Sequence, residues 1–205
     1  TAMKKRLAPE IKDRLRREPN SRARGQMLGS LMDIGDADCL PWIKEDLEKE
    51  NVADWARKVV EYVNQMDPQW LASWMSSKIV AGTHFHSSWL KFLSPASNED
   101  REKVIRHALE LSPSTPNLHR FSFVGTLCRL SHIELVLAEY FSYVARQASG
   151  ERLADGESER MHMLFVIACK ADPNIVVDCT LKNYRSPASD RIRIHVLGLL
   201  TQDRE

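Results

Sequence analysis

The sequence has 205 residues, of which 43% are apolar and 28% charged, a composition that suits one globular core or an array of helical repeats and excludes a disordered or collagen-like chain. Its 29 basic and 28 acidic residues nearly cancel, so the chain lacks the strong positive field of a dedicated duplex-DNA binder. No apolar run reaches the roughly 18 residues that span a bilayer, and no signal-type apolar stretch follows the basic start. We therefore expect a cytoplasmic chain with no membrane partner.

The N-terminal part of the sequence predicts three helices in succession. Apolar residues recur at helical spacing near residues 7–18 and again near 21–34, where Gly35 ends the second helix. Asp36 or Asp38 then starts the third helix, because an Asp side chain accepts hydrogen bonds from the unpaired amides of a first helical turn.

The first and third of these helices share a pattern that indicates a repeat of about 31 to 32 residues. Superposing Ile11 on Ile43 makes the flanking Pro, Lys, acidic and Leu positions coincide as well. Asp36 recurs as Asp67 and again as Asp172, and proline, which is favoured at the first helical position, follows both later copies. A repeat of this length is typical of stacked helix pairs, which bury their apolar faces against their neighbours.

The same pattern predicts helix pairs along the rest of the chain, with an irregular stretch at about 84–116. Strand signals are weak throughout. The expected pairs lie near residues 21–50, 52–81, 84–112, 117–147 and 157–184, and a last single helix lies near 188–201.

The first helix of several pairs carries an arginine followed by apolar residues four and seven positions later. Arg24 begins one copy, and Arg120, Arg160 and Arg193 begin three more. Because these arginines recur with the repeat, we interpret them as part of the scaffold and not as active-site groups.

The segment Arg24–Ile43 resembles the HEAT-repeat family, whose helix pairs join through a Leu-x-x-x-Gly-Asp turn before a helix that opens with Leu-Pro. The resemblance covers about two thirds of the chain and is weakest between residues 81 and 116. It implies an all-α fold, a right-handed superhelical α-solenoid of about five to six HEAT-like pairs, with the recurrent arginines and aspartates forming a ladder between turns. We expect residues 1–205 to form one such domain, cut from a longer chain; a small complete protein is the alternative.

Residue sets for catalysis or metal binding are not evident in the sequence. The four cysteines are dispersed without the close pairs of a zinc site, and we expect reduced, buried thiols. No nucleophile elbow and no phosphate-binding glycine loop is present. We therefore expect no catalytic residue, metal ligand or cofactor in this segment.

Departures from the repeat provide the candidate binding residues. The first helix is rich in basic residues, which suits an acidic partner, and the five tryptophans all lie between residues 42 and 89. Paired charges on a solvated face and tryptophans in the core are the alternative interpretations. The candidate binding residues are Lys5, Arg6, Arg14, Arg17, Trp42, Trp89, His84 and His86.

The sequence favours a non-catalytic scaffold or sensor module that binds a protein or peptide on the surface of the solenoid. Other domains of the same parent chain are among the partners considered. The alternative is a HEAT-like nucleic-acid-binding or DNA-repair protein similar to the helical glycosylases, which bind through a basic concave groove. The near-zero net charge makes this alternative the weaker one.

Overall fold

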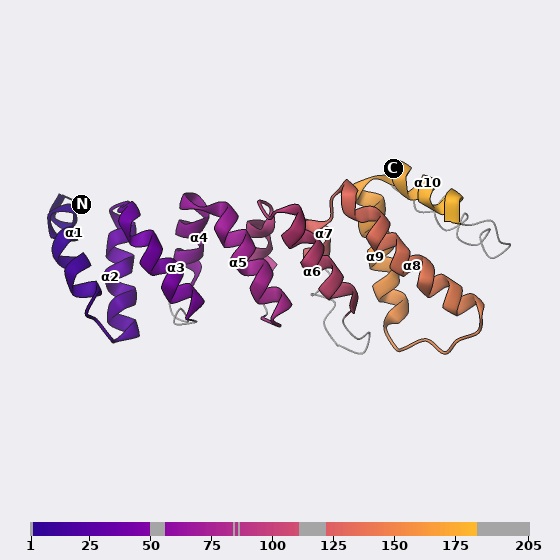
Figure 1. The fold of residues 1–205 in the computed structure, drawn as a ribbon, viewed down its shortest axis with the longest axis horizontal. Helices are drawn as coiled ribbons and strands as arrows, with labels where there is room; N and C mark the ends of the chain where they lie inside the picture. The colour runs from indigo at the N-terminus through magenta and orange to yellow at the C-terminus, as the bar shows by residue number, and fades with distance from the viewer. Residues whose placement is uncertain (1, 50–55, 84, 86, 111–121, 184–205) are drawn as a thin grey trace. The chain divides into compact units, whose positions relative to one another are not determined.

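The computed structural model describes residues 2–49, 56–83, 85, 87–110 and 122–183. Within these ranges the regular secondary structure consists of α-helices and short 3-10 helices with no β-strand, which confirms the predicted all-α class (Figure 1). None of the described helices is long and apolar enough to cross a bilayer. The chain divides into two compact units, residues 1–72 and 73–205, and the superhelix implied by the repeat stays a prediction.

The first unit consists of helices that match the predicted succession. The second helix begins at a cap, because Asn20 accepts hydrogen bonds from the amides of Arg22 and Ala23. Gly35, with a φ of 70°, ends that helix in the left-handed conformation that glycine adopts without strain. The elements are α1 (Ala2–Leu15), α2 (Ser21–Asp33), η1 (Ala37–Cys39), α3 (Leu40–Glu48), α4 (Ala56–Met66) and the beginning of α5 (Pro68–Val80).

The core of the first unit is built from the apolar stripes of these helices. Leucines and isoleucines three or four positions apart share one helix face, and that face packs against the next helix. The large side chains that are fully buried in this unit are Leu15, Leu28, Leu31, Ile43, Leu47 and Leu71. Burial of each stabilises the unit by about 1.5–3 kcal/mol relative to an exposed side chain.

The second unit is less regular at its beginning and becomes a set of longer helices. A 3-10 helix replaces the expected first helix of the pair near 84–112, in agreement with the predicted irregular stretch. Phe165 is fully buried, and its ring lies 4.7 Å from that of Tyr140. The elements are η2 (Ser87–Leu93), α6 (Asn98–Glu110), α7 (Ser122–Leu127), η4 (Leu130–His132), α8 (Ile133–Ala148), α9 (Glu157–Ala171) and α10 (Pro173–Asn183), with α8 packed along α9 (Figure 1).

Candidate functional site

A lysine from one helix binds the aspartate at the start of the next repeat, and this contact occurs twice in the first unit. The Nζ atom of Lys12 lies 2.8 Å from Asp36 and 2.8 Å from Asp38, and the Nζ atom of Lys44 lies 2.7 Å from Asp67. Hydrogen bonding to these lysines lowers the pKa of Asp38 and Asp67. The basic partners in this series are lysines, so the arginine–aspartate ladder that we expected is incorrect for these turns.

The turn aspartates also cap the helices that follow them, as their positions in the sequence predicted. Asp36 accepts a hydrogen bond from the amide of Asp38 at 3.1 Å, and Asp67 accepts one from Trp70 at 3.1 Å. Asp172 in the second unit accepts from the amide of Asn174 at 2.8 Å. These contacts satisfy amides that a helix start leaves unpaired.

The recurrent arginines bind carbonyl groups where preceding helices end, which confirms a scaffold role for the two that the structure describes. Arg24 donates to the carbonyl of Leu15 at 2.9 Å and forms an ion pair with buried Asp46 at 3.0 Å. Arg160 donates to the carbonyl of Leu109. A helix end carries partial negative charge, which favours a cation there. Arg120 and Arg193 lie outside the described residues.

Arg101 performs the same scaffold task in the second unit, although it was not among the predicted arginines. It is 4% exposed and donates to the carbonyls of Ala96 at 2.9 Å, Leu127 at 3.0 Å and Ser94. The residue seven positions after Arg101 is Ala108, whereas the residue seven positions after Arg24 is Leu31. A wider definition of the arginine pattern would therefore have found it.

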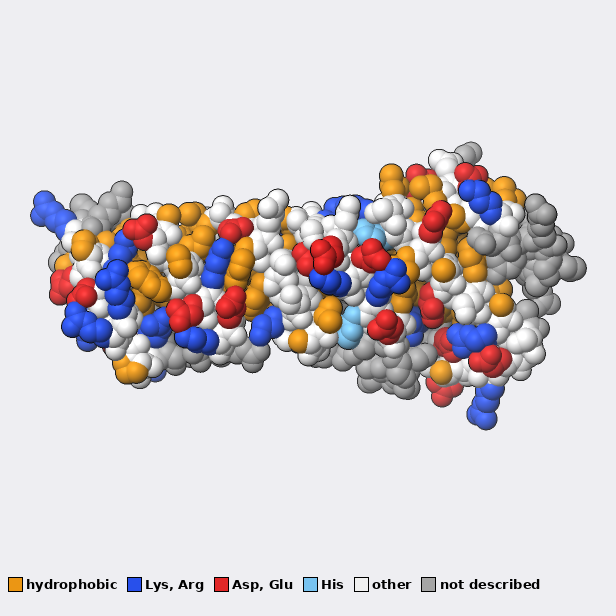
Figure 2. All heavy atoms as spheres, viewed as in Figure 1, with side chains coloured by type: hydrophobic (Ala, Val, Ile, Leu, Met, Phe, Trp, Pro, Cys, Tyr) orange, Lys and Arg blue, Asp and Glu red, His pale blue; other side chains and the backbone are white. Residues whose placement is uncertain are grey.

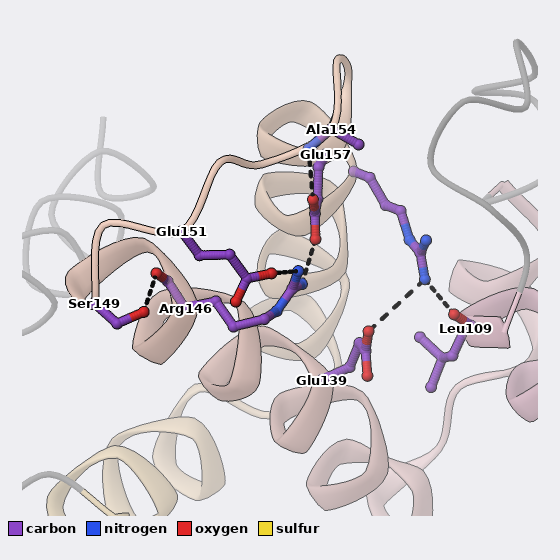
Figure 3. Close-up of polar contacts among 8 residues, drawn as sticks. Leu109, Glu139, Arg146, Ser149, Glu151, Ala154 and Glu157 are labelled. Carbon is purple, nitrogen blue, oxygen red and sulfur yellow. Dashed lines mark hydrogen bonds and ion pairs between the residues drawn. The ribbon is translucent and has the colours of Figure 1, made fainter.

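A second polar network fixes the connection between α8 and α9 (Figure 3). Arg146 on α8 forms ion pairs with Glu157, the first residue of α9, and with Glu151 in the connecting loop at 3.4 Å. Glu157 also accepts a hydrogen bond from the amide of Ala154 at 3.0 Å. Burial alone would raise the pKa of Glu157, but the hydrogen bonds from Arg146 and Ala154 outweigh it and lower that pKa.

The predicted basic residues of the first helix lie at the surface. Arg6, Arg14 and Arg17 are exposed, and Arg17 forms an ion pair with Asp13 one turn earlier. Lys5 belongs to α1, but its side chain lies outside the described part of the structure. The first helix therefore presents basic groups to solvent, as predicted.

Trp42 on α3 is half-buried and carries a cation over its ring. The guanidinium carbon of Arg16, which follows α1, lies 5.9 Å from the ring centroid. This distance falls within the range of about 6 Å over which a cation is attracted to an indole face. Arg16 was not among the predicted site residues, because nothing in the sequence relates it to a tryptophan in another helix. We call Arg14, Arg16, Arg17 and Trp42 the arginine–tryptophan surface.

Trp89 lies in the second unit, in a cluster of three aromatic rings. Its ring stacks on Phe85 with centroids 5.8 Å apart, and Phe85 contacts Trp74 at the same centroid distance. All three side chains are half-buried. His84 and His86, which flank Phe85 in the sequence, lie outside the described residues. The predicted site residues are thus divided between two units.

The charges of the first unit are mixed. On the face drawn in Figure 2, basic and acidic side chains are interspersed over the helices of this unit. Lys12 and Lys44 are paired with acids of the following turns, which bears out the interpretation of ordinary paired faces for part of the charge. Arg14 and Arg16, by contrast, are exposed and form no ion pair among the residues that the structure describes, so they are open to an external partner.

The residues that the structure describes contain no group of three or more His, Cys, Asp or Glu side chains that could hold a metal ion. Three cysteine thiols are shielded: burial raises the pKa of Cys39, of Cys128 and of Cys179. The Cys39 thiol also lies 3.6 Å from the hydroxyl of Tyr62, which itself donates to the carbonyl of Asp36. These thiols are poor nucleophiles, since the thiolate is the reactive form.

Comparison of the chain with models of protein families, with curated proteins and with solved structures found no match. The HEAT-like resemblance therefore depends on residues of this sequence alone, chiefly the turn at Gly35 and Asp36 and the Leu40-Pro41 start of α3.

Proposed function

We propose that this chain is a non-catalytic interaction module, a HEAT-like solenoid that binds a protein or peptide partner in the cytoplasm. The observation that carries this proposal is the exposed guanidinium of Arg16 over the half-buried ring of Trp42. Tryptophan and arginine are the residue types most enriched among those that dominate the energy of protein interfaces. The arginine–tryptophan surface combines both at one place.

The contacts of the charged residues that recur with the repeat support the same proposal. The repeat lysines and arginines are engaged in holding turns and helix ends, as the pairs of Lys44 with Asp67 and Arg24 with Asp46 illustrate. A scaffold of this kind leaves its exterior available for recognition. The nucleic-acid alternative requires a continuous basic surface, and the interspersed acids of the first unit disfavour it.

Site-specific photo-crosslinking tests the proposal in cells that produce the protein. A photoreactive phenylalanine analogue replaces Trp42 in one variant and exposed Gln65 on α4 in the control. We expect the variant at position 42 to cross-link to one identifiable protein, which the purified chain then binds directly. Equal cross-linking at both positions, or failure of the purified partner to bind, would contradict the proposal.

A further inference from the structure

We propose that the partner bound at the arginine–tryptophan surface is an acidic peptide segment that carries a large apolar side chain. This inference rests on the proposed function and specifies its ligand. The acidic residues of the segment pair with the arginines at the end of α1, and the apolar side chain packs against Trp42.

Among the described arginines, some bind groups of the fold through their donors and others do not. Arg24, Arg101 and Arg146 are engaged with carbonyls or carboxylates of the fold. Arg14 and Arg16, by contrast, are exposed and form no ion pair within the described part of the chain. Four arginines lie between residues 14 and 22, so the turn between α1 and α2 has a local excess of positive charge.

The position of Arg16 suits a carboxylate. Its exposed guanidinium lies 5.9 Å from the centre of the Trp42 ring, and a guanidinium carries its N–H donors in the plane of the group. A carboxylate matches this fork of donors, because two parallel N–H···O bonds can form at once.

The acidic residues near these arginines favour a peptide over a nucleic acid as the partner. Acidic side chains lie close to the arginines along the sequence, with Asp13 and Glu18 in the same turn region and Asp38 bound to Lys12. A nucleic-acid backbone carries a charge at every nucleotide and would bring phosphates against these acids. A peptide can place its few carboxylates opposite the arginines and other residues opposite the acids.

Fluorescence anisotropy with defined probes tests the inference. The acidic probe is a labelled peptide of glutamates and aspartates with one central leucine, and two control probes replace the acids by their amides or the leucine by glycine. A fourth probe is labelled single-stranded DNA. We expect the acidic probe to bind best, and added salt to weaken its binding because exposed charges are screened.

Substitutions of single arginines test whether the acidic probe binds at the arginine–tryptophan surface. Arg16→Gln is expected to raise the Kd of the acidic probe about tenfold, which corresponds to the loss of one strong charged contact. Arg16→Lys, which keeps the charge but loses the planar fork, should give a smaller increase. Arg152→Gln, which removes an exposed charge from the second unit, should leave the Kd unchanged. Circular dichroism of each variant verifies that the helices are retained.

Each other outcome would overturn the inference. Equal loss in Arg16→Gln and Arg152→Gln would show attraction by overall charge, and tighter binding of DNA with the same Arg16 dependence would identify a nucleic-acid surface. A photo-crosslinked partner whose contacting segment is not acidic would overturn the inference and leave the proposed function standing. Absence of any protein partner at position 42 would remove the proposed function itself.

Discussion

The Nζ atom of Lys44 lies 2.7 Å from a carboxylate oxygen of Asp67, the residue that caps α5. The pair of Lys12 with Asp36 is the same contact one repeat earlier. Asp36 and Asp67 thus each serve two partners, an amide at the start of the helix that follows and an ammonium group from the corresponding helix of the preceding repeat. The repeat seen in the sequence therefore corresponds to a repeated polar contact as well as to a repeated apolar stripe.

Removal of this cap should destabilise the first unit. Asp67→Ala loses both the cap and the ion pair, and we expect it to lower the free energy of unfolding by about 1 kcal/mol. Asp67→Asn keeps an oxygen for the Trp70 amide and should cost less, because a partly exposed ion pair contributes only about 0.5 kcal/mol. Urea denaturation measures both values. An equal loss in the two variants would assign the effect to the ion pair instead of the cap.

The pair of Arg24 with Asp46 should be the more sensitive of the ion pairs in the first unit. Asp46 is 4% exposed, so Asp46→Ala leaves a mostly buried guanidinium without its carboxylate, and we expect a loss of about 3 kcal/mol. The double variant Arg24→Met with Asp46→Leu removes both charges and should recover most of this loss. A double-mutant cycle of unfolding free energies checks this, and additive losses would indicate that the two groups act independently.

Arg101 should be essential to the second unit. Its guanidinium satisfies three carbonyls, so Arg101→Met should cost about 3 kcal/mol because those buried acceptors lose their donors. Arg106→Met provides the control, since Arg106 is exposed and pairs with Glu102 one turn earlier on the same helix. That change should alter stability by less than about 0.5 kcal/mol. Thermal denaturation of both variants tests the contrast.

Glu157 should make the α8–α9 connection sensitive to acid. Its folded pKa is lower than the ordinary value of 4.5, so its contribution is fully present above that value and is lost as the pH falls through the lower folded pKa. Glu157→Gln should remove this dependence and the ion pair with Arg146. Hydrogen exchange of the Ala154 amide, which donates to Glu157, reports opening of the loop once it is corrected for the intrinsic pH dependence of exchange. Its protection should fall below pH 4.5 in the original chain and be low at neutral pH in the variant.

The helix boundaries could be predicted from the sequence because they depend on local chemistry. Asp67-Pro68 and Asp172-Pro173 begin helices as expected, since capping and the fixed φ of proline act within one turn. Gly35 ended α2 for the same kind of reason. The all-α class followed from these signals together with the apolar spacing.

The partners of charged residues could not be predicted in the same way, because they depend on how helices distant in the sequence pack. In the sequence, Lys12 is marked only by its match to Lys44 in the next repeat. Its contact with Asp36 depends on how α1 and η1 lie relative to each other, which the sequence does not show. Arg16 was overlooked in favour of its neighbours, although it is the one that reaches Trp42. The predicted binding residues include Arg14 and Arg17 of the same surface but omit Arg16, which lies over Trp42.

The order of donor and acceptor along the chain has a consequence for synthesis. Lys12 precedes Asp36, and Lys44 precedes Asp67, so each lysine leaves the ribosome before the aspartate that it binds. The carbonyl of Leu15 likewise emerges before Arg24. A growing chain can therefore close each of these turns against residues that have already emerged, and the first unit can assemble progressively from its N-terminal helix.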